Sequence, residues 1–88
     1  MAAPKPKIVV GVSENGRIVV RGDTYEIKEI LKKHGFMFNS LWKIWEKFYY
    51  HNEDLIKEAL KLIEDLNGKA EIKLLVSKYY LYKKMLEE

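Results

Sequence analysis

Two short runs near the start of the chain, 7–13 and 17–21, are rich in valine and isoleucine and lie on either side of Glu14-Asn15-Gly16. Such β-branched runs bounded by turn residues are typical of β-strands, so they predict a hairpin. A two-residue Asn-Gly turn would divide the apolar residues between two faces. A three-residue loop with Gly16 in the left-handed conformation gathers them on one face, so this register is predicted. Its core face holds Ile8, Val10, Val12, Ile18 and Val20, and its outer face holds Lys7, Val9, Arg17, Val19 and Arg21.

Apolar residues at helical spacing predict two helices. The first lies between Asp23 and Gly35, where Asp23 and Glu26 have the spacing of a capping box and Gly35 is a natural stop. Its apolar stripe is Ile27, Ile30, Leu31 and His34. The second begins after an N-cap at Asn52 and ends at Gly68. Its core stripe is Leu55, Ile56, Ala59, Leu60, Ile63 and Leu66.

Between the two helices lies an aromatic segment, residues 36–50, which holds both tryptophans, all three phenylalanines and two of the six tyrosines. Aromatic and β-branched residues favour strands, so 36–39 and 43–50 predict a second hairpin with a turn near Ser40. Successive side chains of a strand point to opposite faces. The second strand therefore has Lys43, Trp45, Lys47 and Tyr49 on one face, and Ile44, Glu46, Phe48 and Tyr50 on the other.

Two alternatives stay open for this second hairpin. The face with Trp45 is either part of the core or a binding surface, because lysines interleaved with rings suit single-stranded nucleic acid. A loop of residues 40–42 places Met37 beside Trp45 and leaves the nearby phenylalanines in the core. One more loop residue brings Phe36 and Phe38 to the face of Trp45.

The order hairpin, helix, hairpin, helix predicts an α+β fold with a four-stranded antiparallel sheet (ββαββα) and both helices on one face. The other face of the sheet would then be open to solvent. On it we expect basic residues of the first hairpin beside the basic and aromatic residues of the second. These residues are Lys7, Arg17, Arg21, Lys43, Trp45, Lys47 and Tyr49.

The last segment, residues 70–88, predicts an additional C-terminal helix. Its apolar residues recur at alternating spacings of three and four, the heptad pattern of helices that pack on one another. This seam is Ile72, Leu75, Tyr79, Tyr82 and Leu86, and a second apolar line is Leu74, Leu81 and Met85. A helix that is apolar on two sides needs two partners, which predicts a homo-oligomer. The alternative is a single broad core stripe in a monomer.

These elements divide the chain into three parts. Residues 1–6 form a flexible tail, residues 7–68 an α+β domain, and residues 69–88 a helix for oligomerisation.

Composition and charge limit the class of protein. The 88 residues suffice for one small domain, and the absence of cysteine excludes disulfides and thiolate metal sites. No apolar run has the length of a membrane span or a secretory signal, which favours a cytoplasmic protein. Glutamine is absent while lysine and glutamate abound, a composition that leans towards a thermophile. Residues 1–51 carry nine Lys/Arg against five Asp/Glu, and residues 52–88 carry seven against eight, so the half with the hairpins suits a polyanion.

Catalytic chemistry is not evident in the sequence. His34 and His51, the only imidazoles, lie 17 residues apart in different elements and do not define a metal site. The serines have no evident partner base, and the glycines form no phosphate-binding loop. We therefore predict that the protein is not an enzyme and holds neither a metal nor a cofactor.

Between Gly22 and Trp45 the chain spells G-[DE]-T-Y-x-x-K-x-x-L-K-x-x-G-F-x-F-N-x-x-x-K-x-W. With this motif it resembles the ThermoDBP-related single-stranded DNA-binding proteins of thermophilic archaea, over most of residues 8–66. The resemblance implies an α+β domain that holds the bases of a single strand in a cleft, and a C-terminal helix used for assembly. It further implies base contacts from Phe36, Phe38, Trp42, Trp45 and Tyr49, and phosphate contacts from Arg17, Arg21, Lys43 and Lys47.

The expected function is single-stranded DNA binding by a dimer or tetramer, largely independent of sequence. Stacking requires only the π-face that every base has, and phosphate contacts carry no sequence information. RNA binding, or a protein-interaction module with an aromatic docking face, are the alternatives.

Overall fold

The N-terminal hairpin has the register that the three-residue loop requires. In the computed structural model, which describes residues 4–49 and 54–87, strand β1 (Lys7–Val12) pairs antiparallel with β2 (Arg17–Gly22). Val12 lies opposite Ile18, the N–H of Ser13 donates to the carbonyl of Arg17 over 2.9 Å, and Gly16 has a φ of 83°. The five apolar residues predicted for the core face are all buried, so the predicted hairpin is confirmed.

The remaining elements complete a five-stranded mixed sheet with the strand order β3-β4-β2-β1-β5. After β2 the chain forms a 3₁₀ turn (Tyr25–Ile27) and helix α1 (Lys28–Lys33). Then come β3 (Met37–Asn39), β4 (Ile44–Phe48), α2 (Leu55–Leu66), β5 (Glu71–Val76) and α3 (Lys78–Glu87). β1 runs antiparallel to β2 and parallel to β5. The α+β class is as predicted, whereas the purely antiparallel, four-stranded sheet is not.

The C-terminal segment is the largest difference from the predicted fold. Residues 71–76 form strand β5 rather than the first half of a helix, and only residues 78–87 are helical. Ile72, Leu74 and Val76 alternate with more exposed residues and pack against the core, while Leu75 points to the other face. The outer edge of β1 offers unpaired backbone groups, and pairing with them satisfies those of this segment. The hydrogen bonds between β5 and β1 therefore favour a strand, although a heptad pattern of just over two repeats favours a helix.

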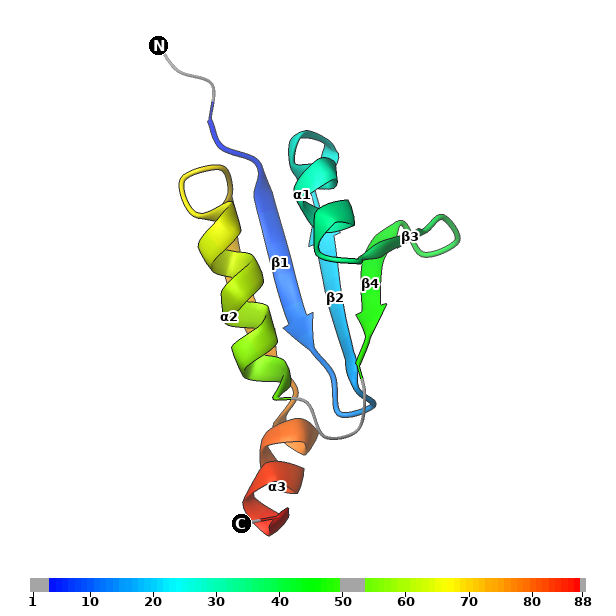
Figure 1. The fold of residues 1–88 in the computed structure, drawn as a ribbon, viewed down its shortest axis with the longest axis vertical. Coiled ribbons are helices and arrows are strands. Elements are labelled where there is room, and N and C mark those ends of the chain that lie inside the picture. Colours follow the sequence, from blue (N-terminus) through cyan, green and yellow to red (C-terminus); the bar gives the residue numbers. More distant parts are fainter. Residues whose placement is uncertain (1–3, 50–53, 88) are drawn as a thin grey trace.

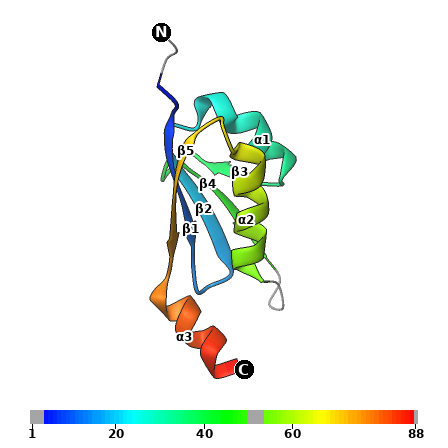
Figure 2. The same ribbon diagram turned by 90° about the vertical axis from the view of Figure 1, so that its left-hand side faces the viewer.

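Both α1 and α2 cover the same face of the sheet, as predicted (Figures 1 and 2). α3 continues from the end of β5 and extends beyond the sheet, at the end opposite the N-terminus (Figure 1). We call the face under α1 and α2 the covered face and the opposite one the open face. Figure 2, in which the sheet is seen along its edge, shows no described helix lying on the open face.

The helix starts differ from the predicted ones. α1 begins through the 3₁₀ turn without a side-chain cap, so the capping box at Asp23 is wrong. Asp54 caps α2: its Oδ1 accepts from the N–H groups of Ile56 (3.1 Å) and Lys57 (3.2 Å). The carboxylate of Asp54 also suits the positive end of the helix dipole. The predicted cap Asn52 lies outside the described residues.

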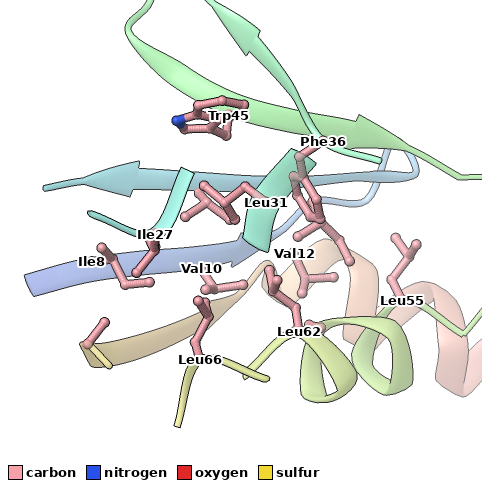
Figure 3. Close-up of a cluster of buried hydrophobic side chains, with 14 of the residues drawn as sticks. Ile8, Val10, Val12, Ile27, Leu31, Phe36, Trp45, Leu55, Leu62 and Leu66 are labelled. Atoms are coloured by element: carbon pink, nitrogen blue, oxygen red, sulfur yellow. The ribbon is translucent and has the colours of Figure 1, made fainter. Parts of the chain in front are cut away.

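The core lies between the covered face and the helices (Figure 3). From the helices it receives Ile27, Leu31, Leu55, Ala59, Leu62 and Leu66. Leu60, predicted for this stripe, is exposed, because the buried positions of α2 are spaced four, three and four apart and omit it. His34 Nε2 lies 2.6 Å from Asp65 Oδ2, and this hydrogen bond between α1 and α2 lowers the pKa of Asp65.

Of the predicted N-terminal tail the structure describes only residues 4–6, which belong to no helix or strand. Residues 1–3 lie outside the described part of the chain. None of the described helices is long and apolar enough to cross a membrane.

Candidate functional site

The register of the second hairpin determines which aromatic residues share a face. Phe38 lies opposite Trp45 and Asn39 opposite Ile44, so the loop consists of residues 40–43. This is the longer of the two loops considered from the sequence. It brings Phe38 to the face of Trp45, where the two ring centroids are 5.3 Å apart and the rings are tilted by 58°.

That shared face is the covered face and not the open one. In the pairing of β2 with β4, Val20 lies opposite Trp45, and residues opposite each other in antiparallel strands share a face. Trp45 is therefore on the side of the buried Val20 and is only 7% exposed. Its indole lies among the buried side chains of the core (Figure 3), and its Nε1 donates to Thr24 Oγ1 over 3.0 Å. The prediction that Trp45 lies beside Arg17 and Arg21 on the open face is wrong. In the observed pairing with β2, Glu46 and Phe48 of β4 share the open face with Arg17, and Trp45 is on the covered face.

Three further predicted contacts lie on the covered side with Trp45. Phe36 is buried in the core. Lys47 Nζ donates to the carbonyl of His34 over 2.8 Å, at the end of α1, where a cation suits the negative end of the helix dipole. The same Nζ lies 4.8 Å from the ring centroid of Tyr49, which packs half-buried against the core. Of the predicted stripe of lysines and rings, Trp45, Lys47 and Tyr49 therefore support the helices, whereas Lys43 belongs to the loop of residues 40–43.

The open face contains a groove of about 870 Å³. Its floor comes from the central strands β1 and β2, one side from the β3–β4 loop and β4, and the other from the end of β5. The residues that line it are Val9, Gly11, Val12, Ser13, Glu14, Arg17, Val19, Arg21, Trp42, Lys43, Ile44, Leu75, Val76 and Ser77. The groove thus has an apolar floor with cations around it.

Gly11 widens the floor of this groove. It lies in the middle of the sheet with Val19 on one side and Leu75 on the other. A Cβ added there would lie 3.9 Å from the carbonyl oxygen of Val19, an ordinary contact. The fold therefore tolerates a side chain at this position, and the absence of one leaves the space to the groove.

Trp42 lies at the rim of the groove and is 70% exposed. The loop that carries it is held by Asn39, whose Oδ1 accepts from the N–H groups of Leu41 (3.1 Å) and Trp42 (3.3 Å). Lys43 completes the turn in the left-handed conformation, with a φ of 56°. The loop therefore presents an exposed indole from a hydrogen-bonded turn.

The three cations of the groove are not equivalent. Arg17 Nη1 forms an ion pair with Glu46 Oε2 at 3.1 Å, and its guanidinium lies 5.9 Å from the ring centroid of Phe48. Its Nε is buried and has no hydrogen-bond partner among the described residues. Arg21 and Lys43 form no ion pair within residues 4–49 and 54–87, so their charges are available to a ligand.

One carboxylate also lines the groove. The pKa of Glu14 is held below its ordinary value by hydrogen bonds from its own backbone N–H and from Ser77, whose Oγ lies 2.8 Å from Glu14 Oε2. This hydrogen bond joins the β1–β2 loop to the residue before α3, and both residues line the groove. Arg17, Arg21 and Lys43 against this single acid leave the lining positive.

Of the nine residues predicted to contact nucleic acid, the groove brings together Arg17, Arg21, Trp42 and Lys43. Phe36, Phe38, Trp45, Lys47 and Tyr49 lie on the covered side. Gly11 and Ile44 were missed. A glycine inside a strand, away from any turn, was the one signal in the sequence that could have indicated Gly11.

The residues predicted for oligomerisation are also divided. Tyr79, Tyr82 and Leu86 are exposed on α3, Leu75 lines the groove, and Ile72 packs against the core. The described residues contain no cluster that could hold a metal ion, and His51 lies outside them.

No protein-family model matches the chain, and comparisons with curated proteins and with solved structures found no significant match.

Proposed function

We propose that the open face binds single-stranded DNA in the groove, largely independently of sequence. One observation carries the proposal: an exposed indole, Trp42, and two cations that form no ion pair among the described residues, Arg21 and Lys43, line the same groove over an apolar floor. An aromatic plane beside positive charge is the combination that single strands require, because bases stack on the ring while cations neutralise the phosphates.

In this proposal the residues of the groove have different roles. Trp42 stacks on a base, Arg21 and Lys43 contact phosphates, and the apolar floor of Val9, Val19 and further aliphatic residues receives the next base. Arg17 is bound to Glu46 and chiefly keeps the floor in place. None of these contacts reads a base edge, so the binding tolerates any sequence, and RNA is the competing ligand to measure.

The protein that binds is proposed to be a homo-oligomer. The exposed apolar side chains of α3, Tyr79, Leu81, Tyr82, Met85 and Leu86, form a surface that a second subunit would cover. Changing Tyr79 and Tyr82 together to Glu would then separate the subunits that α3 joins. Sedimentation of the unchanged protein as a monomer would contradict this part of the proposal.

The test of the function is fluorescence anisotropy of labelled single-stranded DNA, single-stranded RNA and duplex DNA of equal length, titrated with protein at low and at physiological salt. We expect preferential binding of single-stranded DNA that weakens as salt is added. If no oligonucleotide binds at low salt, the nucleic-acid proposal is wrong and the groove is a docking surface for protein.

A change at Gly11 locates the binding to the groove. Gly11→Val fills the floor without removing a charge or a ring, and Gly11→Ala fills less of it. We expect stability to be unchanged or raised by up to about 1 kcal/mol, because glycine in a strand is unfavourable. Affinity for single strands should fall by about tenfold or more with Val, as expected for the loss of a stacked base, and less with Ala. Equal affinity of all three proteins would place the binding elsewhere.

A further inference from the structure

The outer edge of β5 is open among the described residues. Within residues 4–49 and 54–87, β5 is the last strand of the sheet and pairs only with β1. The N–H groups of Glu71 and Ser77 donate to the carbonyls of Pro6 and Val12, on the side of β1. Because backbone groups alternate in direction along a strand, those of the even-numbered residues 72, 74 and 76 point away from the sheet.

The two edges of the sheet differ in how well they can accept another strand. β3, at the other edge, has three residues and leads directly into a tight loop. β5 has six regular residues, EIKLLV, without proline or glycine. Edge strands of this length are ordinarily blocked by proline, bulges or repeated charges, and here the only charges, Glu71 and Lys73, have opposite signs. The outer edge of β5 can therefore accept a further strand.

We propose that a second copy of this chain pairs with β5 in antiparallel orientation around a two-fold axis at Leu74, and so joins two sheets into one. The residue pattern is self-complementary around this axis. On the covered side Leu74 meets Leu74 of the partner subunit, and Ile72 meets the partner subunit's Val76. The outward backbone groups of these residues form the hydrogen-bonded pairs of the new ladder.

Two other symmetric registers fit less well. A two-fold axis at Lys73 places two lysines directly opposite each other, which is destabilising. An axis at Ile72 pairs only the first half of β5 and leaves Val76 beyond the ladder. The axis at Leu74 pairs the whole strand, with Lys73 opposite Leu75 of the partner subunit.

The pairing would also complete the groove, and this consequence rests on the proposed binding of single strands. Leu75 lines the groove on its β5 side. In the dimer, Lys73 of the partner subunit lies next to it on the open face. Each groove then gains a cation from the other subunit, and the two grooves lie side by side on one continuous face.

Cysteine cross-linking tests the pairing without nucleic acid. The chain has no cysteine, so introduced thiols are the only ones. Lys73 and Leu75 of the partner form a non-hydrogen-bonded pair, whose Cα atoms lie about 4.5 Å apart, within the range of a disulfide. The double variant Lys73→Cys/Leu75→Cys should form a covalent dimer with oxidised glutathione, whereas Lys57→Cys/Lys61→Cys on α2 should not. Equal yields from both variants would overturn the proposal, and efficient dimers from Lys73→Cys alone would overturn its register.

Charge substitutions at Leu75, measured by sedimentation equilibrium, provide a second test. Leu75 is 41% exposed on the open face, so Leu75→Lys and Leu75→Glu leave the core intact. In the proposed register the new lysine faces Lys73 of the partner and the new glutamate forms an ion pair with it. The dimer dissociation constants of the two variants should differ by about two- to thirty-fold, with the Lys variant the weaker. A monomeric parent, or equal constants for both variants, would sink the pairing. Single-strand binding by a protein that fails these tests would leave the proposed function intact.

Discussion

Trp42 and Trp45 are separated by only two residues, yet they lie on different sides of the molecule. Trp45 is 7% exposed, donates a hydrogen bond to Thr24 and contacts Phe38 on the covered face. Trp42 is 70% exposed, and its loop presents it at the rim of the groove on the open face. One aromatic segment thus supplies both an anchor of the fold and the exposed ring of the candidate site.

The comparison shows how local geometry assigns these roles. Trp45 occupies a strand position whose direction is determined by the pairing of β4 with β2. Trp42 belongs to a four-residue loop, residues 40–43, held by the side chain of Asn39. The density of rings in the segment therefore does not indicate a binding surface by itself, because most of these rings stabilise the covered face.

The largest effect that follows from this comparison is on stability. Trp45→Ala removes a buried indole and leaves the Thr24 hydroxyl without its donor, so we expect a loss of about 3–5 kcal/mol in the free energy of unfolding. This is a large share of the roughly 5–15 kcal/mol typical of a domain. Denaturation by urea, followed by circular dichroism, measures the change.

Trp42→Ala is the matched control for that experiment. It removes the same side chain from the surface, and we expect the free energy of unfolding to change by less than about 0.5 kcal/mol. Similar losses from both substitutions would mean that Trp42 is also an anchor of the fold, and the contrast between the two rings would disappear.

The register and the buried face of the first hairpin could be predicted from the sequence, whereas for the second hairpin only the two strands could. In the first, only one loop length gathers Ile8, Val10, Val12, Ile18 and Val20 on one face, so burial selects the register. In β4 both faces carry apolar rings and charged residues. The sequence of β4 alone therefore does not indicate which face is buried. The pairing with β2 determines which face is covered.

The role of β5 also depended on a distant partner. Ile72, Leu74 and Val76 satisfy the two-residue period of a strand, while Ile72 and Leu75 satisfy helical spacing. The segment is a strand because it pairs with the free edge of β1, about sixty residues earlier in the chain. The local sequence pattern contains no information about this distant partner. For the same reason the groove could not be predicted, since β5 forms one of its sides.

The second effect is on the binding of single-stranded DNA, where removing Trp42 should matter more than removing an exposed ring outside the groove. Trp42→Ala should weaken the binding of single-stranded DNA by the equivalent of about 1–3 kcal/mol, the cost of losing one stacked base. Tyr25 is 73% exposed and is not among the groove residues, so Tyr25→Ala should bind as the parent does. Anisotropy titrations at one salt concentration compare the three proteins. An equal loss from Tyr25→Ala would mean that the binding is not confined to the open face.

The smallest effect distinguishes the cations of the two faces. Arg21 lines the groove without an ion pair among the described residues, whereas Lys57 is exposed on α2, on the covered side. Each phosphate neutralised on a single strand contributes about 0.7 to the slope of log affinity against log salt concentration. Arg21→Gln should therefore reduce that slope by about 0.7, while Lys57→Gln removes the same charge and leaves the slope unchanged.

The two substitutions lower the net charge of the protein equally, so a difference between them cannot come from its overall field. Titrations at several salt concentrations give the slopes directly. If both variants reduce the slope alike, the positive charge acts only as a diffuse attraction. The open face would then have no special role in binding, although the contrast between Trp42 and Trp45 in stability would remain.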